Sequence, residues 1–398
     1  MPLNLALPFS VNLKNRALTS GIKMRILFVI ENYVPHIGGV EIVFKNLAEG
    51  LAKKGHDVTI ITHKSSGAKG YEELNGVKIH RINCLQSRYL FSFLAIPKAV
   101  KEARKADIIH TTTFNGAFPA WIASKLTGRK CAITVHEVWI GKWKDYTTMN
   151  LLQACLHNFL EKLIYFLPFD KYVAVSNSTK RQLLELGKSP EKTVTVHNAV
   201  DYKHFDPKKH SGKKIREEYE WDDKFVCLTY GRPGPSKGME YAIKAIPLIG
   251  IPKLRYVFIL SKDKQYLLKL RKLKSMIREL HIEKKTILLE PVPHKMLPKY
   301  IRAADCVVVP SLSEGFGYTA AEACALGVPV VATRTTSLPE VVSGKHLLVN
   351  PKSSEEIATA VERVYNKKYE NTPLKRFLLE KNINGYLKIY RELISKQG

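Results

Sequence analysis

The sequence predicts an α/β protein with two domains, each built on a parallel, doubly wound sheet. Short apolar runs rich in β-branched residues alternate with amphipathic helical patterns along nearly the whole chain. A length of 398 residues exceeds what a single hydrophobic core usually organises. A composition of 45% hydrophobic and 25% charged residues is typical of a folded globular protein.

The first half of the chain begins this alternation at Met24. A strand at 25–30 leads through a loop into an amphipathic helix that ends at Gly55. Gly38 and Gly39 lie where that loop meets the helix, and a glycine pair lets the backbone approach a ligand closely, although most such pairs are ordinary turns. Further strands are predicted at 57–62, 77–82, 107–112, 130–137 and 172–175.

The segment 138–168 mixes aromatic, basic and apolar residues and is open to two interpretations. Such a stretch can lie at a membrane interface or form part of an acceptor cleft. It can equally be a core helix with a decorated loop, which is the interpretation we favour. A turn-rich run at 193–209 follows and is the predicted interdomain linker.

The second half opens with a strand at 225–230 and the loop GRPGPSKG before a helix. Arg232 and Lys237 lie in this strand-to-helix loop, where two cations and glycine amides can hold a diphosphate. An ordinary turn remains the alternative. The next strand, 254–260, precedes a basic helical stretch that we interpret as a solvated helix face, with a membrane-surface or polyanion patch as the alternative.

The run VVVPSLSEGFGYTAAEACALGVP, 307–329, combines a buried strand, a glycine loop and a helix N-terminus. Backbone N–H groups at such a helix start, together with the helix dipole, favour a phosphate group. Glu314 lies in the loop and Glu322 about one turn into the helix. We interpret the two carboxylates as separate clamps for sugar and ribose hydroxyls, with surface glutamates as the alternative.

Together these motifs resemble the nucleotide-sugar-dependent glycosyltransferases of family GT4. Glu314 and Glu322 match the Glu-x7-Glu signature of that family, and GRPGPSKG matches its G-R-x-x-x-x-K-G arrangement. The resemblance implies the GT-B fold, in which two Rossmann-like doubly wound domains face a cleft. We place the acceptor-side domain at 24–200 and the donor-side domain at 201–377. A helix at 378–398 would cross back to the first domain, and 1–23 would be a flexible extension.

The resemblance also implies the roles of the site residues. A hexosyl group would move from a nucleoside-diphosphate sugar to an acceptor hydroxyl with retention of configuration. Arg232 and Lys237 would stabilise the leaving diphosphate, and Glu314 and His136 would contact the transferred sugar. Glu137 follows His136 where the family usually has Asp. The remaining donor-binding residues would be Glu322 at the ribose, Val292 near the base, and Gly38, Gly39, Gly315, Phe316, Gly317, Tyr318 and Thr319 around the phosphates.

The net charge and the cysteine content limit which partners and which cellular compartment are expected. The net charge of +27 implies an anionic partner: nucleic acid, an anionic membrane face or phosphorylated substrates. The basic residues are dispersed and no nucleic-acid module is evident, so nucleic acid is not expected. We expect a glycan or a lipid-linked acceptor. Six cysteines without metal-type spacing, and apolar runs too short to span a bilayer, predict a cytoplasmic protein, with peripheral contact at the membrane face left open.

No metal or cofactor is expected, because Arg232 and Lys237 would supply the charge that Mg²⁺ otherwise provides, and the sequence contains no Asp-x-Asp triplet. Two other functions stay open from the sequence. One is a nucleotide-sugar epimerase of similar fold, which would need no acceptor. The other is a non-catalytic basic protein that binds anionic membrane or nucleic acid.

Overall fold

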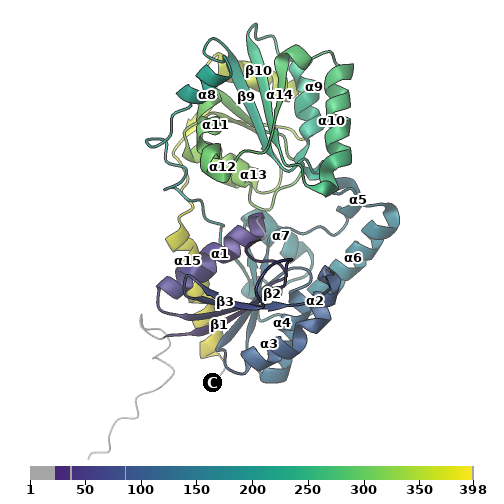
Figure 1. Cartoon of the computed structure of the whole chain (residues 1–398), viewed down its shortest axis with the longest axis vertical. Coiled ribbons are helices and arrows are strands. Elements are labelled where there is room, and N and C mark those ends of the chain that lie inside the picture. Colours follow the sequence, from purple (N-terminus) through teal and green to yellow (C-terminus); the bar gives the residue numbers. More distant parts are fainter. Residues whose placement is uncertain (1–22, 36–37, 86, 397–398) are drawn as a thin grey trace, which may run out of the picture. The chain divides into compact units, whose positions relative to one another are not determined.

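The computed structural model describes residues 23–35, 38–85 and 87–396, so the predicted extension lies outside the described residues except for Lys23. Two α/β domains carry one sheet of eight strands and one of seven in this part of the chain (Figure 1). By contacts, the described residues up to Thr134, Leu167–Tyr172 and the described residues from Ile383 onward form one compact unit. Val135–Phe166 and Val173–Asn382 form the other. The domain boundaries predicted at 200 and 377 stay a prediction.

The eight-stranded sheet has the order β3-β4-β2-β1-β5-β6-β7-β8. Strands β2, β1, β5 and β6 pair in parallel, and the edge strand β3 runs antiparallel to β4. Its strands are β1 Arg25–Val29, β2 Asp57–His63, β3 Tyr71–Leu74, β4 Val77–Ile82, β5 Ile108–Thr112, β6 Cys131–Val135, β7 Lys171–Ala174 and β8 Thr193–Thr195. The helices of this part of the chain are α1 Gly39–Lys53, α2 Arg88–Leu94, α3 Ile96–Ala103, α4 Ala117–Thr127, α5 Trp143–Tyr146, α6 Leu151–Phe166 and α7 Asn177–Glu185.

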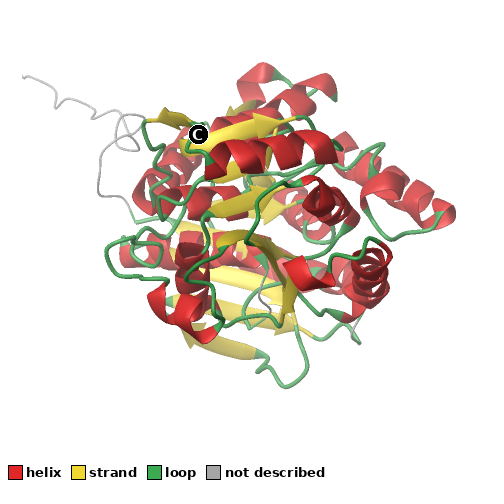
Figure 2. Cartoon of the chain, turned by 90° about the horizontal axis from the view of Figure 1, so that it is seen from above, coloured by secondary structure: helices red, strands yellow, loops and turns green. Residues whose placement is uncertain are grey.

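The seven-stranded sheet of the described residues has the order β11-β10-β9-β12-β13-β14-β15, in which five neighbouring pairs are parallel and β14 and β15 are antiparallel. Its strands are β9 Phe225–Gly231, β10 Leu254–Leu260, β11 Thr286–Leu289, β12 Cys306–Val309, β13 Val330–Thr333, β14 Gly344–Val349 and β15 Glu370–Thr372. The helices are α8 Lys213–Glu218, α9 Met239–Ala245, α10 Leu267–Glu279, α11 Leu297–Ala303, α12 Tyr318–Ala325, α13 Leu338–Val341, α14 Ser354–Tyr365 and the C-terminal α15 Leu379–Ser395. Helices flank the strands, as the red and yellow elements of Figure 2 show.

The predicted strands are confirmed to within about two residues at each end, and 77–82 and 254–260 coincide with β4 and β10. The reason is burial on both faces: β6 and β12 are fully buried, so their sequences, CAITV and CVVV, are almost entirely apolar and do not alternate. Cys306 and Cys324 are buried and free, as their apolar surroundings predict. No helix among the described residues is both long enough and apolar enough to cross a membrane.

Helix α6 departs from our expectation. The segment 138–168 was expected to supply a core helix, but α6 buries only Ala154, Glu161 and Tyr165. Its large apolar side chains lie on the solvent side, with Leu152 80% and Phe166 83% exposed. Apolar spacing identifies an amphipathic helix but does not say which face the rest of the protein covers. Here a buried carboxylate, not the leucines, faces the protein.

Candidate functional site

The candidate site lies at the carboxyl edge of the seven-stranded sheet. Strand β9 pairs with β10 on one side and with β12 on the other, so the strand order reverses there. Ligands of open α/β sheets bind outside the carboxyl ends of the strands at such a reversal. The loop after β9 contains Arg232 and Lys237, and the loop after β12 contains Glu314 and Gly315. Chain topology therefore brings the two predicted motifs to one place.

The two loops pack backbone against backbone. The N–H of Leu312 donates to the carbonyl oxygen of Ser236 at 2.7 Å. Gly238 adopts a left-handed φ of +59°, and a Cβ there would lie 2.1 Å from the carbonyl oxygen of Pro310. No side chain fits in that space, so glycine is required at this position.

Glu314 and Lys237 form the central ion pair. Nζ of Lys237 lies 2.7 Å from Oε1 of Glu314, and the Glu314 side chain is 9% exposed. The same carboxylate oxygen accepts a hydrogen bond from Oγ of Ser311 at 2.7 Å. The backbone of Glu314 is fixed as well, because its N–H donates to Oγ1 of Thr336 at 2.8 Å and its carbonyl accepts from Ser337 at 2.9 Å. The carboxylate is thus held in one orientation.

Thr336 is itself unusual, since it has a positive φ of +41°. A β-branched residue rarely adopts this conformation, and such backbone outliers gather at functional sites. The conformation accompanies the hydrogen bond between Oγ1 of Thr336 and the Glu314 amide.

His136 and Gly315 are brought together within the second compact unit. A Cβ on Gly315 would lie 2.0 Å from the carbonyl oxygen of His136, so the two backbones touch. Burial lowers the pKa of His136 to about 4, which makes its ring neutral near pH 7. Glu137 accepts a hydrogen bond from Oγ of Ser313. Burial raises the pKa of Glu137 to about 7, with the hydrogen bond from Ser313 opposing the shift.

The helix α12 starts as the sequence predicts. Gly317 is its N-cap with a φ of +90°, and a Cβ there would lie 2.7 Å from Cδ2 of Leu338. Glu322, inside the helix, lies 2.9 Å from Oη of Tyr230, whose proton can be shared with the carbonyl of Thr319 at 3.1 Å. Burial raises the pKa of Glu322 to about 7, and the Tyr230 hydrogen bond opposes that shift.

Phe316 is placed differently from its neighbours. Its ring is buried and packs edge-on against Phe377 at 5.1 Å and Tyr318 at 5.2 Å, inside the core of the seven-stranded sheet. The phenyl ring is therefore a core group, and only the backbone of Phe316 is available to a ligand. Tyr318 and Thr319 open α12 and are half-buried.

The remaining predicted residues are Arg232, Val292, Gly38 and Gly39. Arg232 is 46% exposed, with Nε 4.0 Å from the carboxylate of Asp263. Val292 lies in the loop after β11, half-buried against the core. Gly38 caps α1 and Gly39 opens it, both in the first compact unit, and a Cβ on Gly39 would meet no atom within 4 Å. Their roles stay predictions.

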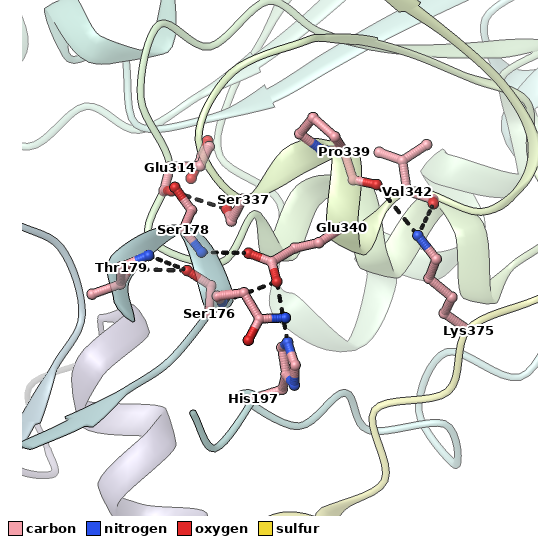
Figure 3. A network of polar contacts seen from close by, with 11 residues as sticks. Ser176, Ser178, Thr179, His197, Glu314, Ser337, Pro339, Glu340, Val342 and Lys375 are labelled. Atoms are coloured by element: carbon pink, nitrogen blue, oxygen red, sulfur yellow. Dashed lines mark hydrogen bonds and ion pairs between the residues drawn. The ribbon is translucent and has the colours of Figure 1, made fainter. Parts of the chain in front are cut away.

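A second polar network, which the sequence did not reveal, adjoins the Glu314 loop (Figure 3). The carboxylate of Glu340 in α13 accepts from the N–H groups of Asn177 and Ser178 at 2.9 and 3.0 Å and lies 3.3 Å from Nε2 of His197. Burial opposes ionisation, but these hydrogen bonds lower the pKa of Glu340 below its usual value. The carboxylate thereby caps the N-terminus of α7, whose N-cap residue is Ser176.

A cavity of about 260 Å³ opens beside the end of β10 and β11, next in sequence to the Val292 loop. Its lining is apolar with basic groups, and includes Leu260, Lys262, Leu267, Arg271, Lys274 and Glu290. Within the described residues, no group of three or more His, Cys, Asp or Glu side chains is arranged to hold a metal ion.

Comparison with known proteins places these features in a family. The model of Glycosyltransferase Family 4 matches residues 37–204, and that of Glycosyl transferases group 1 matches residues 211–378. An uncharacterized glycosyltransferase of Methanocaldococcus jannaschii is 28% identical over 86% of this chain and 89% of its own length. The phosphatidylinositol N-acetylglucosaminyltransferase GPI3 subunit of Saccharomyces cerevisiae is 24% identical over 86% of this chain and 75% of its own length.

Solved structures share the fold. Anabaena HepE in complex with UDP has a TM-score of 0.70 at 19% identity, over 94% of this chain and 98% of that one. Sucrose-phosphate synthase from Thermosynechococcus elongatus has a TM-score of 0.72 at 21% identity, over 94% and 97%. Two sheets of eight and seven strands, matched along their length by such proteins, make the fold GT-B. The chain belongs to the GT4-like glycosyltransferases and is a transferase enzyme.

Proposed function

We propose that the protein transfers a hexosyl group from a nucleoside-diphosphate sugar to a hydroxyl of a lipid-linked or glycan acceptor. Configuration at the transferred carbon is retained, and no metal ion takes part. HepE, which shares the fold, has been solved with UDP and with UDP-glucose, which supports a nucleotide-sugar donor. The yeast relative is named for transfer to phosphatidylinositol, which supports a lipid acceptor.

The observation that carries the proposal is the 2.7 Å pair between Lys237 and Glu314. It joins a cation suited to a diphosphate and a carboxylate suited to sugar hydroxyls at the carboxyl edge of the sheet. The glycine Gly317 and the N-terminus of α12 follow three residues after Glu314. Backbone amides, a lysine and a carboxylate therefore converge where one end of the donor is anionic and the other is rich in hydroxyls.

In the reaction, the bond between the anomeric carbon and the diphosphate oxygen breaks while the acceptor oxygen bonds to the same face of that carbon. The proton of the acceptor hydroxyl passes to the departing phosphate oxygen, which balances the step. Arg232, Lys237 and the amides from Gly315 to Thr319 stabilise the negative charge that develops on the diphosphate. These groups replace the charge of a divalent cation, so the activity is expected to survive chelation.

The other residues orient the donor. Glu314 accepts hydrogen bonds from the sugar hydroxyls, and the neutral ring of His136 contacts the transferred sugar. Glu322 binds the ribose, in place of its present contact with Tyr230. Val292 packs near the base. The glycines Gly38 and Gly39 allow close approach of the first α1 turn to the donor phosphates and the acceptor.

The proposal extends to location. The net charge of +27 suits an enzyme that works in the cytoplasm and contacts the anionic face of a membrane, where a lipid-linked acceptor would lie.

A thermal-shift panel tests the donor site. Wild type and Arg232→Ala are heated with UDP, GDP and ADP and with their common sugar conjugates, all in EDTA. One nucleotide should raise the Tm of wild type, and the shift should be lost in Arg232→Ala, because the guanidinium no longer meets the diphosphate. Arg255→Ala, which removes a half-buried guanidinium on β10, serves as a control for loss of an arginine.

The same panel can overturn the proposal. If no nucleotide shifts the Tm, the donor assignment fails. If the shift appears only when Mg²⁺ replaces EDTA, metal independence fails while the donor site stands. Steady-state kinetics complete the test, because Arg232→Ala should mainly lower kcat and Glu322→Ala should mainly raise the donor KM.

A further inference from the structure

Helix α6 presents a large apolar face to solvent. The side chains of this face, which we call the α6 apolar face, are Leu152, Leu156, Phe159, Leu163 and Phe166, with exposures of 80, 53, 58, 46 and 83%. They follow one another at spacings of four, three, four and three residues, so they form one continuous stripe. Soluble monomers rarely leave a contiguous apolar stripe of this kind bare, and larger patches mark interaction sites.

The orientation of α6 is fixed by polar contacts on its opposite side. Glu161 is 1% exposed and accepts from the N–H of Trp139 at 2.9 Å and from Nε1 of Trp143 at 2.7 Å. Lys188 donates from Nζ to the carbonyl oxygen of Tyr165. Turning the helix to bury its leucines would break these contacts and leave a buried carboxylate without donors, which is strongly unfavourable. The outward stripe is therefore built into the fold.

Charges around the stripe favour an anionic partner. Glu161 is the sole acidic residue of α6, and it points inward. Lys162 is exposed on the helix beside the stripe. On the segment before the helix, Lys144 and Asp145 are both exposed, whereas Lys142 is half-buried near the inward Glu161. The chain as a whole carries +27. A leucine and phenylalanine face with lysines beside it is the pattern of a helix that lies in a membrane interface.

A second copy of the chain fits this face less well. The spacing of four and three is also that of a coiled-coil seam, but α6 has 16 residues, just over two heptads. Seams that hold on their own run for about three to four heptads and carry complementary charges at their flanks. The flanking positions here are Gln153, Cys155, Leu160 and Lys162, so a lysine is present but no acidic residue to pair with it in a second copy.

We propose that the α6 apolar face docks on the surface of an anionic bilayer. The helix lies in the plane of the membrane, with its leucine and phenylalanine side chains at the boundary between headgroups and acyl chains and its lysines at the headgroups. This inference rests on the proposed function and deepens it, because docking on the membrane would bring the enzyme to a lipid-linked acceptor.

Vesicle sedimentation tests the surface directly. Full-length protein is mixed with vesicles of phosphatidylcholine alone or with about one third phosphatidylglycerol added, at low and at high salt. Wild type should bind the anionic vesicles more tightly, and salt should weaken the binding. Leu152→Ser/Phe166→Ser should weaken it about 100-fold, because two inserted side chains lose their transfer free energy.

Leu126→Ser/Leu268→Ser is the matched control. Both leucines are exposed, at 69 and 76%, and lie on α4 and α10. Because all four positions are exposed, both double variants should fold with the wild-type Tm. The control should bind vesicles as wild type does.

Three outcomes would overturn the inference: wild type that ignores anionic vesicles, an α6 double variant that binds them unchanged, or a control that loses binding equally. A wild-type dimer in light scattering that the α6 double variant converts to monomer would assign the face to a second copy instead. The nucleotide panel on the same variants separates the two proposals. A preserved nucleotide shift without vesicle binding rejects only the docking surface, and vesicle binding without any nucleotide shift rejects only the donor site.

Discussion

The carboxyl edges of the two sheets contain the same kinds of residues but differ in the ligand groups that they could bind. In the eight-stranded sheet the order reverses at β1 and β5, and there Glu31 is paired with Arg88 at 2.9 Å and accepts from Asn115 at 2.7 Å. In the seven-stranded sheet the reversal holds Glu314 paired with Lys237 at 2.7 Å. Each edge has a nearly buried glutamate, a cation and a glycine pressed against backbone, which is Gly116 in the first and Gly315 in the second.

The difference lies in what surrounds each pair. The Glu314 loop leads directly into a glycine N-cap and the helix α12, so amides and cation converge on one point. The partners of Glu31 are an exposed arginine on α2 and an amide side chain after β5. The comparison teaches that topology sets where a site lies, while the local loop chemistry sets which ligand group it takes.

The largest effect on stability is expected at the glycine that each edge presses against neighbouring backbone. Gly315→Ala should lower the free energy of unfolding by roughly 3 kcal/mol, because its Cβ would lie 2.0 Å from a carbonyl oxygen that belongs to rigid backbone. Gly116→Ala should cost about 2 kcal/mol, since its Cβ would lie 2.6 Å from the carbonyl oxygen of Val29. Urea denaturation measures both values.

Gly70→Ala is the matched control, because a Cβ there meets no atom within 4 Å. It should change stability by less than about 0.5 kcal/mol. Equal stability of Gly315→Ala and Gly70→Ala would mean that the backbone contact at Gly315 is not tight.

Substitution of the cation at each edge, Lys237 or Arg88, should show which edge binds the nucleotide. Lys237→Ala should lower kcat by about 100-fold or more, because one charge facing the leaving diphosphate is lost. Arg88→Ala should leave the nucleotide-induced Tm shift unchanged. Lys237→Arg should recover part of the rate, since the charge is kept while the geometry changes. A nucleotide shift that depends on Arg88 as strongly as on Lys237 would contradict the division of roles.

The network beside the second edge should contribute a smaller amount. Glu340→Gln should lower the free energy of unfolding by about 1 to 2 kcal/mol, because a neutral amide caps the N-terminus of α7 less well than a carboxylate. Thermal and urea denaturation would measure it, with the exposed Glu218→Gln on α8 as the control. A loss no greater than that of the control would show that the cap is dispensable.

The last effect concerns the pH dependence of stability. The pKa of Glu322 is raised to about 7 in the folded protein, so the folded state holds its proton more tightly than the unfolded chain does. The stabilising contribution is therefore complete below the unfolded pKa and is lost as pH rises toward 7. Glu322→Gln should flatten the pH dependence of unfolding between about pH 4.5 and 7 by up to roughly 3 kcal/mol, since the pKa rises from 4.5 to about 7. An unchanged slope in denaturation without nucleotide would place the pKa near its ordinary value.

The sequence predicted the fold better than it predicted the side-chain partners. Most strands that are buried on both faces have mainly apolar sequences, so their positions could be predicted. Lys237 and Glu314 were each recognised, but their ion pair depends on β9 and β12 being neighbours, which no local pattern states. The contact of Glu137 with Ser313 and the cap from Glu340 escaped prediction for the same reason. The outward face of α6 was misjudged, because burial of Glu161 outweighs the apolar stripe.

The contact between Gly315 and His136 also limits how this lineage can diverge. The obstructing atom is a main-chain carbonyl oxygen, so no substitution of the histidine side chain makes room for a larger residue at 315. At Phe316, by contrast, the neighbours are side chains such as Tyr318 and Phe377, which can change in compensation. The aromatic residue at 316 can therefore be replaced in evolution one substitution at a time. A residue larger than glycine at 315 would require the backbones of the Gly315 loop and of the His136 segment to move together.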